Sequence, residues 1–283
     1  MSKRIVCTTS TSCLDYYPHE ENIRTIRLKI DINNDLHDDG TDILAQDFFE
    51  KINADHNLIP KTSQPSIGSL LDFFEGLAEE GYEEVIVTTL SSRLSGTYNG
   101  ICQCANMLED KIKIIPFDTK TVCFAEGCFA LKAAEMVRLG ESTKVILNTL
   151  EHMRNNNKIM FAVDSLEYLV KNGRLSGAAG FLGKMFKIKP ILEVFEDGTI
   201  QAVEKIRTTK KALEGVCERF KEYAKGHEYF AFICYTGPEL KEFFIKALKE
   251  KAGLENVLET LASPVVGCHV GGQAIGIGIF LKD

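Results

Sequence analysis

The sequence has little of what marks several large classes of protein. Only 7 of its 283 residues are proline and 45% are hydrophobic, which is the composition of a globular protein and not of a disordered tail. No apolar run approaches the ~20 residues of a membrane-spanning helix. Basic residues are in the minority, with 33 against 40 acidic ones. The net charge of −7 argues against nucleic-acid binding, which needs Lys and Arg to replace the counterions of the phosphates.

Catalytic and metal-binding signatures are also missing. The chain has no GxSxG elbow, no Walker-type phosphate loop, no GxGxxG turn that opens a helix after a strand, and no HExxH pair. Its nine cysteines are odd in number and scattered, without metal-ligand spacing. We therefore expect small buried cysteines in a reducing cytosol, and no metal. No signal peptide is visible before the first strand-like run, which predicts a cytoplasmic protein.

The pattern that is present alternates short β-rich runs with amphipathic helices. The β-rich runs are short, rich in branched residues and not alternating, which favours parallel strands buried between helices. They cover residues 4–8, 84–90 and 112–117. Helical spacing covers residues 41–54, 67–78 and 121–139, and Ser66 is the predicted N-cap of the second helix. This alternation predicts an α/β fold with a mainly parallel sheet flanked by helices.

A second series of elements predicts a second α/β domain, with a mixed sheet. The dipeptide Asp197-Gly198 favours an antiparallel hairpin between strands 191–195 and 199–207. Further strands are predicted at 158–163, 228–235 and 273–281, and further helices at 209–224 and from Pro238 onward. The polar run at residues 155–157 places the boundary. We therefore predict domains 1–156 and 157–283, with a ligand crevice between them.

Two local patterns in the second half carry their own predictions. Residues 164–167 read Asp-Ser-Leu-Glu, which resembles the capping box that opens a helix. Glycines recur at positions 173, 177, 180 and 183 among small residues, which favours close helix packing over a phosphate loop.

Three hydroxyl-rich clusters fall at strand ends or helix starts. They span residues 8–12, 62–66 and 91–98. Taken singly, each is explained by turns and N-caps, where Ser and Thr are common. Taken together, hydroxyls and free backbone N–H groups near helix N-termini predict a site for an anion such as a carboxylate or phosphate. Arg93, Arg174 and His269 are candidates to supplement it, and His269 lies in a Gly-rich segment, 264–272, where the backbone can approach a ligand.

The order of these motifs resembles the DegV family over nearly the whole chain. The resemblance is carried by Thr62-Ser63-Gln64-Pro65-Ser66, Ser91-Ser92-Arg93-Leu94-Ser95-Gly96-Thr97-Tyr98, Leu166-Glu167-Tyr168-Leu169, Gly173-Arg174-Leu175-Ser176, Ile188-Lys189-Pro190-Ile191 and Gly267-Cys268-His269-Val270-Gly271. It implies a two-domain α/β protein that binds one long-chain fatty acid in a buried tunnel between its domains. Some family members are carrier subunits of bacterial fatty acid kinase, presenting the carboxylate to a separate ATP-using protein.

The resemblance also implies roles for particular residues. The carboxylate would be held by the hydroxyls of Thr62 and Ser91 and by the backbone N–H of Ser92. His269 and Arg174 would lie behind the head group, and Arg174 with Arg207 would form a surface for the kinase. No catalytic residue, metal or cofactor is implied; the ligand is the fatty acid.

Two departures and two alternatives accompany this interpretation. The family's opening Thr-Asp-Ser reads Thr8-Thr9-Ser10 here, which removes an acid, and its Gly-Pro-Gly after the histidine reads Gly271-Gly272-Gln273. One alternative is an acyl- or phosphoryl-transfer enzyme with Ser91 as nucleophile and His269 as base. The other is a regulatory interaction module in which the lipid is only structural.

Overall fold

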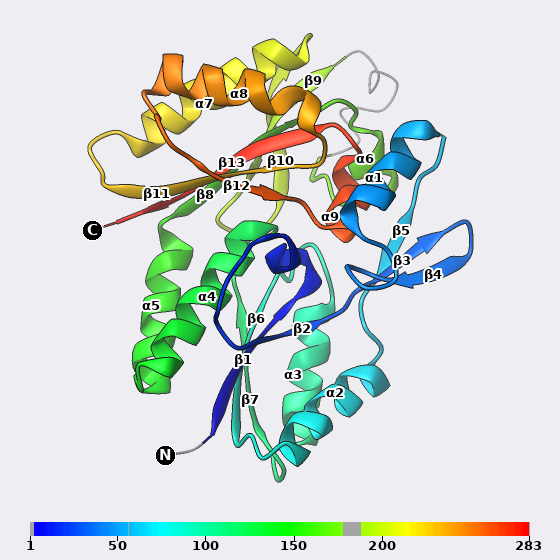
Figure 1. The fold of residues 1–283 in the computed structure, drawn as a ribbon, viewed down its shortest axis with the longest axis vertical. Helices are drawn as coiled ribbons and strands as arrows, with labels where there is room; N and C mark the ends of the chain where they lie inside the picture. Colours follow the sequence, from blue (N-terminus) through cyan, green and yellow to red (C-terminus); the bar gives the residue numbers. More distant parts are fainter. Residues whose placement is uncertain (1–2, 56, 178–187, 283) are drawn as a thin grey trace.

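The computed structural model describes residues 3–55, 57–177 and 188–282 (Figure 1). Its two main sheets are stacked with helices below, between and above them. The elements of the first half are β1 (Arg4–Thr9), β2 (Ile23–Ile26), β3 (Lys29–Ile32), β4 (Asp35–Asp38), α1 (Ala45–Ala54), β5 (Lys61–Ser63), α2 (Ile67–Glu79), β6 (Glu84–Thr89), α3 (Thr97–Met107), β7 (Lys113–Asp118), α4 (Phe124–Arg138) and α5 (Thr143–Asn155).

The first sheet is the predicted parallel one. Its strands run in the order β2-β1-β6-β7 and all pair in parallel. Strand β6 is buried along its whole length, as its continuous apolar pattern predicts. Helices α2 and α3 cover one face and α4 and α5 the other. The cap of α2 is also confirmed, because the Ser66 hydroxyl accepts the Ser69 N–H at 3.0 Å.

The second sheet is mixed, as the sequence predicts. Its strands are ordered β10-β9-β8-β13-β11-β12, and only β11 and β12 pair in parallel. The hairpin prediction is confirmed, and Gly198 takes the positive φ of +84° that its turn requires. The elements of this half are β8 (Asn157–Val163), α6 (Glu167–Lys171), β9 (Lys189–Val194), β10 (Ile200–Ile206), α7 (Thr209–Ala224), β11 (Tyr229–Tyr235), α8 (Lys241–Ala247), β12 (Leu258–Leu261), α9 (Pro264–Val270) and β13 (Ala274–Leu281).

The two sheets share a core that is centred on α4. Phe129 of this helix contacts Phe117 below it at 6.0 Å and Phe280 of the upper sheet at 5.6 Å between ring centroids. Near its start, Phe124 packs edge-on against Phe232 of β11 at 5.0 Å. Helices α7 and α8 cover the outer face of the upper sheet (Figure 1). One helix therefore packs against both halves of the chain and holds them together.

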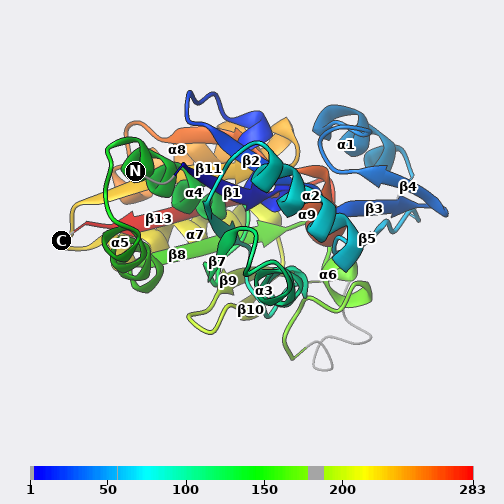
Figure 2. The ribbon, with the colours of Figure 1, turned by 90° about the horizontal axis from the view of Figure 1, so that it is seen from below.

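A third, three-stranded sheet is an element that the sequence analysis missed. Strands β4, β3 and β5 pair antiparallel in that order, and with α1 they project to one side of the molecule (Figure 2). Their apolar residues pack against α9, which belongs to the second half of the chain. Each strand has only 3 or 4 residues, too few for a periodic pattern to be recognised.

Three local predictions need correction. The Gly-rich segment with His269 is mainly helical, because residues 264–270 form α9, and its Gly267 is approached by Phe48 and Phe49 where a ligand was expected. Asp164 caps no helix: it pairs with Lys189, and α6 begins at Glu167. Gly173 and Gly177 lie in turns with φ of +70°, and Gly180 and Gly183 fall outside the described residues.

Candidate functional site

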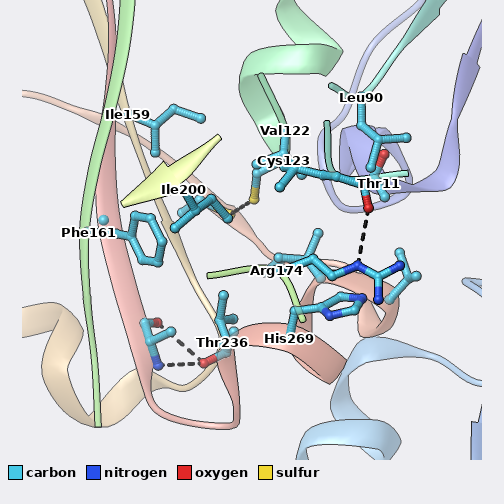
Figure 3. A pocket seen from close by; sticks show the side chains of 18 of the residues that line it. Thr11, Leu90, Val122, Cys123, Ile159, Phe161, Arg174, Ile200, Thr236 and His269 are labelled. Carbon is cyan, nitrogen blue, oxygen red and sulfur yellow. Dashed lines mark hydrogen bonds between the residues drawn. The ribbon is translucent and has the colours of Figure 1, made fainter. Parts of the chain in front are cut away.

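A largely apolar cavity lies between the two main sheets and reaches β5 and α9, which contribute to its lining. Including its opening, it contains about 1070 Å³ of empty space. Its apolar wall is the inner face of the upper sheet, with Ile159 and Phe161 from β8 (Figure 3) and also Phe232 from β11. Other lining residues are Leu28, Leu90, Leu94, Val122, Ile200, Ala262, Val265, Val266, Val270 and Ile277. A space of this kind suits a long hydrocarbon ligand.

The polar lining includes a pair that the sequence analysis proposed. The Thr62 hydroxyl, on β5, lies 2.9 Å from Nε2 of His269, on α9. The position of α9 is fixed in turn by buried Asp39, whose Oδ1 accepts the Val265 N–H at 3.2 Å. Two residues that are 207 positions apart are thus brought into one site by the packing of the small sheet on α9.

His269 is electrically neutral in this environment. Burial, and after it the positive charge of Arg174, lowers its pKa to about 3. Its Nδ1 atom has no hydrogen-bond partner in the described part of the chain. The ring can therefore offer a hydrogen bond to a ligand but no charge.

The positive charge in the cavity comes from Arg174. Figure 3 shows its guanidinium group beside the His269 ring. Its Nε atom donates to the Leu94 carbonyl at 3.2 Å and Nη1 donates to the Asn172 carbonyl. Among the residues that the structure describes, no carboxylate forms a salt bridge with it. A guanidinium held by carbonyl oxygens alone keeps its charge for an anionic ligand.

The other two predicted carboxylate contacts, Ser91 and Ser92, do not line this cavity. The Ser91 hydroxyl donates to the Gly198 carbonyl at 2.8 Å, and the Ser92 N–H donates to Asp118 at 3.2 Å. The chain turns after β6, so that Ser95 and Gly96 reach the cavity in their place. The hydroxyl cluster 91–98 was identified from the sequence, but the turn decides which of its members faces the ligand space.

The catalytic alternative lacks its central contact. Ser91 is paired with a backbone carbonyl and His269 with Thr62, and no hydrogen bond joins Ser91 to His269 in the described structure. A serine nucleophile needs its base within about 2.6–3.2 Å.

Arg207, the other predicted surface residue, is exposed just after β10.

A buried carboxyl group behind the cavity was not predicted. Glu126 of α4 is 0% exposed and is hydrogen-bonded by the hydroxyls of Thr8, Thr9 and Thr11 and by the Thr9 N–H. Thr11 also lines the cavity. Burial raises the pKa of Glu126 to about 8, although these hydrogen bonds oppose the rise. The family pattern has an aspartate where this chain has Thr9. Here Glu126 of α4 places a carboxyl group beside Thr9 instead.

The second departure from the family pattern also has a structural reason. A Cβ atom built on Gly272 would lie 2.0 Å from Oδ1 of Asn53, at the end of α1. A larger side chain at this position would force the Asn53 side chain to move aside. Glycine therefore permits the close contact between the small sheet's helix and the segment that carries His269.

The fold and the cavity together define a class: an α/β protein of two stacked sheets that enclose an apolar ligand space with a polar end. The sequence model of the DegV family, described as "Uncharacterised protein, DegV family", matches residues 3–282. The chain belongs to the DegV family. Among the described residues, no helix is both long and apolar enough to cross a membrane.

Individual relatives agree with this assignment. A DegV domain-containing protein of Listeria innocua is 34% identical over 287 residues, with all of both chains covered. Among solved structures, DegV of Bacillus subtilis, described as a fatty acid binding protein, is 34% identical with a TM-score of 0.85 and full coverage of both chains. A fatty acid binding DegV family protein of Streptococcus agalactiae is 28% identical, with a TM-score of 0.88 and the same coverage.

Proposed function

We propose that this protein binds one long-chain fatty acid in the cavity between its two main sheets. The observation that carries the proposal is the cavity itself, apolar along the upper sheet and ending at Thr62, His269 and Arg174. A C16 chain buries roughly 14 methylenes at ~0.8 kcal/mol each, or about 11 kcal/mol before the costs of binding. The tail therefore supplies affinity, while the polar end sets the orientation. The solved relatives described as fatty acid binding proteins support the same ligand class.

The carboxylate is expected at the polar end of the cavity. The Thr62 hydroxyl and the Arg174 guanidinium are donors there, neutral His269 orients Thr62, and Ser95 is the serine of the cluster 91–98 that reaches the cavity. The family resemblance instead suggests Ser91 and Ser92 as the contacts beside Thr62. For Ser91 to serve, its hydroxyl must leave the Gly198 carbonyl when the ligand binds.

The test compares matched serine variants of delipidated protein in titrations with a fluorescent C16 fatty acid. Losing one hydrogen bond to the charged carboxylate costs ~1.5–3 kcal/mol, so Ser95→Ala and Thr62→Val each weaken binding roughly 10- to 160-fold. Ser91→Ala leaves the affinity unchanged. If Ser91→Ala weakens binding and Ser95→Ala does not, the carboxylate lies at Ser91 and Ser92. If protein purified from bacteria carries no C14–C18 lipid and takes up none, the proposed function fails.

We further propose that the bound carboxylate is presented to a fatty acid kinase protein, so that this chain acts as a carrier in the cytoplasm without catalysis of its own. Exposed Arg207 and the cavity-lining Arg174 are the proposed contacts with that partner. The proposed domains, 1–156 and 157–283, place Thr62 and His269 in different halves, so relative movement of the halves would expose the head group.

The carrier role has its own experiment. Acyl phosphate is measured after the loaded protein is mixed with a bacterial fatty acid kinase and ATP. Arg207→Ala should lower acyl-phosphate formation and leave fatty-acid affinity unchanged, whereas the exposed control Lys225→Ala should change neither. Acyl phosphate formed without the kinase, or labelling of Ser91 by an activated acyl ester, would favour the enzymatic alternative instead.

A further inference from the structure

Three cysteines that are scattered in the sequence meet at the cavity wall. Cys13 lies between two short 3₁₀ turns after β1, Cys123 directly precedes α4, and Cys234 lies on β11. The Cys123 sulfur is 3.6 Å from that of Cys13 and 3.0 Å from that of Cys234, the contact drawn as a dashed line in Figure 3. All three sulfurs lie within 4.8 Å of one another. Separations of about 110 residues hide this cluster from any spacing motif.

The backbone of two of these cysteines is strained in a way that ordinary core cysteines are not. Cys13 has φ of +60° and Cys123 has φ of +64°. Residues other than glycine rarely adopt positive φ, and residues strained in this way cluster at functional sites. The described chain has only five such residues, and two of them direct sulfurs into one cluster. Simple hydrophobic packing gives no reason for this coincidence.

We propose that Cys13, Cys123 and Cys234 form a three-sulfur binding site for the soft, monovalent metal ion Cu(I). Metal–thiolate bonds of about 2.3 Å, the length known for zinc, place three sulfurs of a trigonal site about 4.0 Å apart. The measured separations of 3.0 and 3.6 Å, and a third within 4.8 Å, require movements of about 1 Å or less. Soft thiolate ligands favour Cu(I), together with zinc and iron–sulfur clusters.

The number of available ligands favours Cu(I) over structural zinc. In the described part of the chain, no fourth His, Cys, Asp or Glu ligand atom joins the three sulfurs, whereas structural zinc requires four ligands. The three sulfurs bind as thiolates, so their three thiol protons are released to solvent as the copper–sulfur bonds form.

The experiment titrates Cu(I) under argon into reduced, delipidated protein in competition with a chromophoric Cu(I) chelator. We expect one Cu(I) per chain to be withheld from the chelator. Cys123→Ser removes the central sulfur and should weaken Cu(I) binding at least ~100-fold. Loss of a residue that only hydrogen-bonds to a metal ligand already lowers metal affinity ~10–100-fold, and loss of a ligand itself costs more. Cys234→Ser should do the same. Bound Cu(I) should also raise the thermal unfolding midpoint of the parent, since a ligand of the folded state stabilises it.

The matched control is Cys102→Ser, since Cys102 is half-buried on α3 and outside the cluster. It should bind Cu(I) as the parent does, and circular dichroism of each variant establishes that it is folded. The proposal is overturned if the parent withholds no Cu(I), if Cys102→Ser loses it equally, or if the Cys123 and Cys234 variants retain it. If Zn(II) binds as tightly as Cu(I), the assignment of a three-coordinate Cu(I) site is wrong. Because no fatty acid is present, none of these results depends on the proposed function.

Discussion

The buried carboxyl of Glu126 makes a strong prediction about stability and pH. Replacing it by glutamine keeps the shape and an oxygen that accepts from Thr8 and Thr9, and it offers an N–H to Thr11 in place of the acid proton. The variant Glu126→Gln therefore mimics the protonated acid and cannot ionise. Any difference in pH dependence between the two proteins reports the titration of this one group.

The magnitude follows from the two pKa values. In the unfolded chain Glu126 has its ordinary pKa of 4.5, and in the folded protein burial raises the pKa to about 8. Between these values the unfolded chain loses its proton while the folded protein keeps it, so rising pH favours unfolding by about 1.4 kcal/mol per pH unit. Relative to Glu126→Gln, the parent should lose about 4 kcal/mol of unfolding free energy from pH 4.5 to pH 8. Well below pH 4.5 the difference should be constant.

The assay is urea unfolding followed by circular dichroism at intervals between pH 4 and pH 9, with free energies from linear extrapolation. Glu135→Gln, on the same helix but half-exposed beside Lys132, is the control and should follow the parent. A difference that stays constant over the whole range would refute the reasoning. A parent that gains stability relative to the variant as pH rises would show that the threonine hydroxyls hold an ionised carboxylate.

Further predictions concern the shared core and the histidine. Phe129→Ala should lower the unfolding free energy by about 3–5 kcal/mol, measured by urea unfolding, because Phe129 is 0% exposed and contacts both halves. Phe230→Ala, at a ring that is 38% exposed, should cost much less, and equal costs would contradict this account of the core. His269 should remain neutral from pH 5 to pH 8 in an NMR titration of its ring, because its pKa is about 3. An imidazole that titrates near pH 6.5 would mean that Arg174 and burial do not act on it as described.

Local sequence patterns predicted a helix start or a turn correctly where the residues that determine it are close neighbours in the chain. Ser66 caps α2 because its hydroxyl reaches an N–H only three residues away. Asp197-Gly198 forms its turn because glycine alone takes that positive φ freely. The helix with His269 was missed because residues 264–270 contain one glycine, three valines and one cysteine, a composition with weak helical preference. It forms through packing on Phe48 and Phe49.

The amino-acid sequence alone was enough for the α/β class, the two kinds of sheet and the identity of the hydroxyl clusters, because periodicity and turn chemistry act over a few residues. Only the tertiary structure decided which groups meet. It places Thr62 beside His269, turns Ser95 and not Ser91 toward the cavity, buries Glu126 against Thr9, and gathers Cys13, Cys123 and Cys234. Each of these contacts joins residues more than 100 positions apart or depends on the path of a turn. Such contacts follow from how layers pack, which no local pattern encodes.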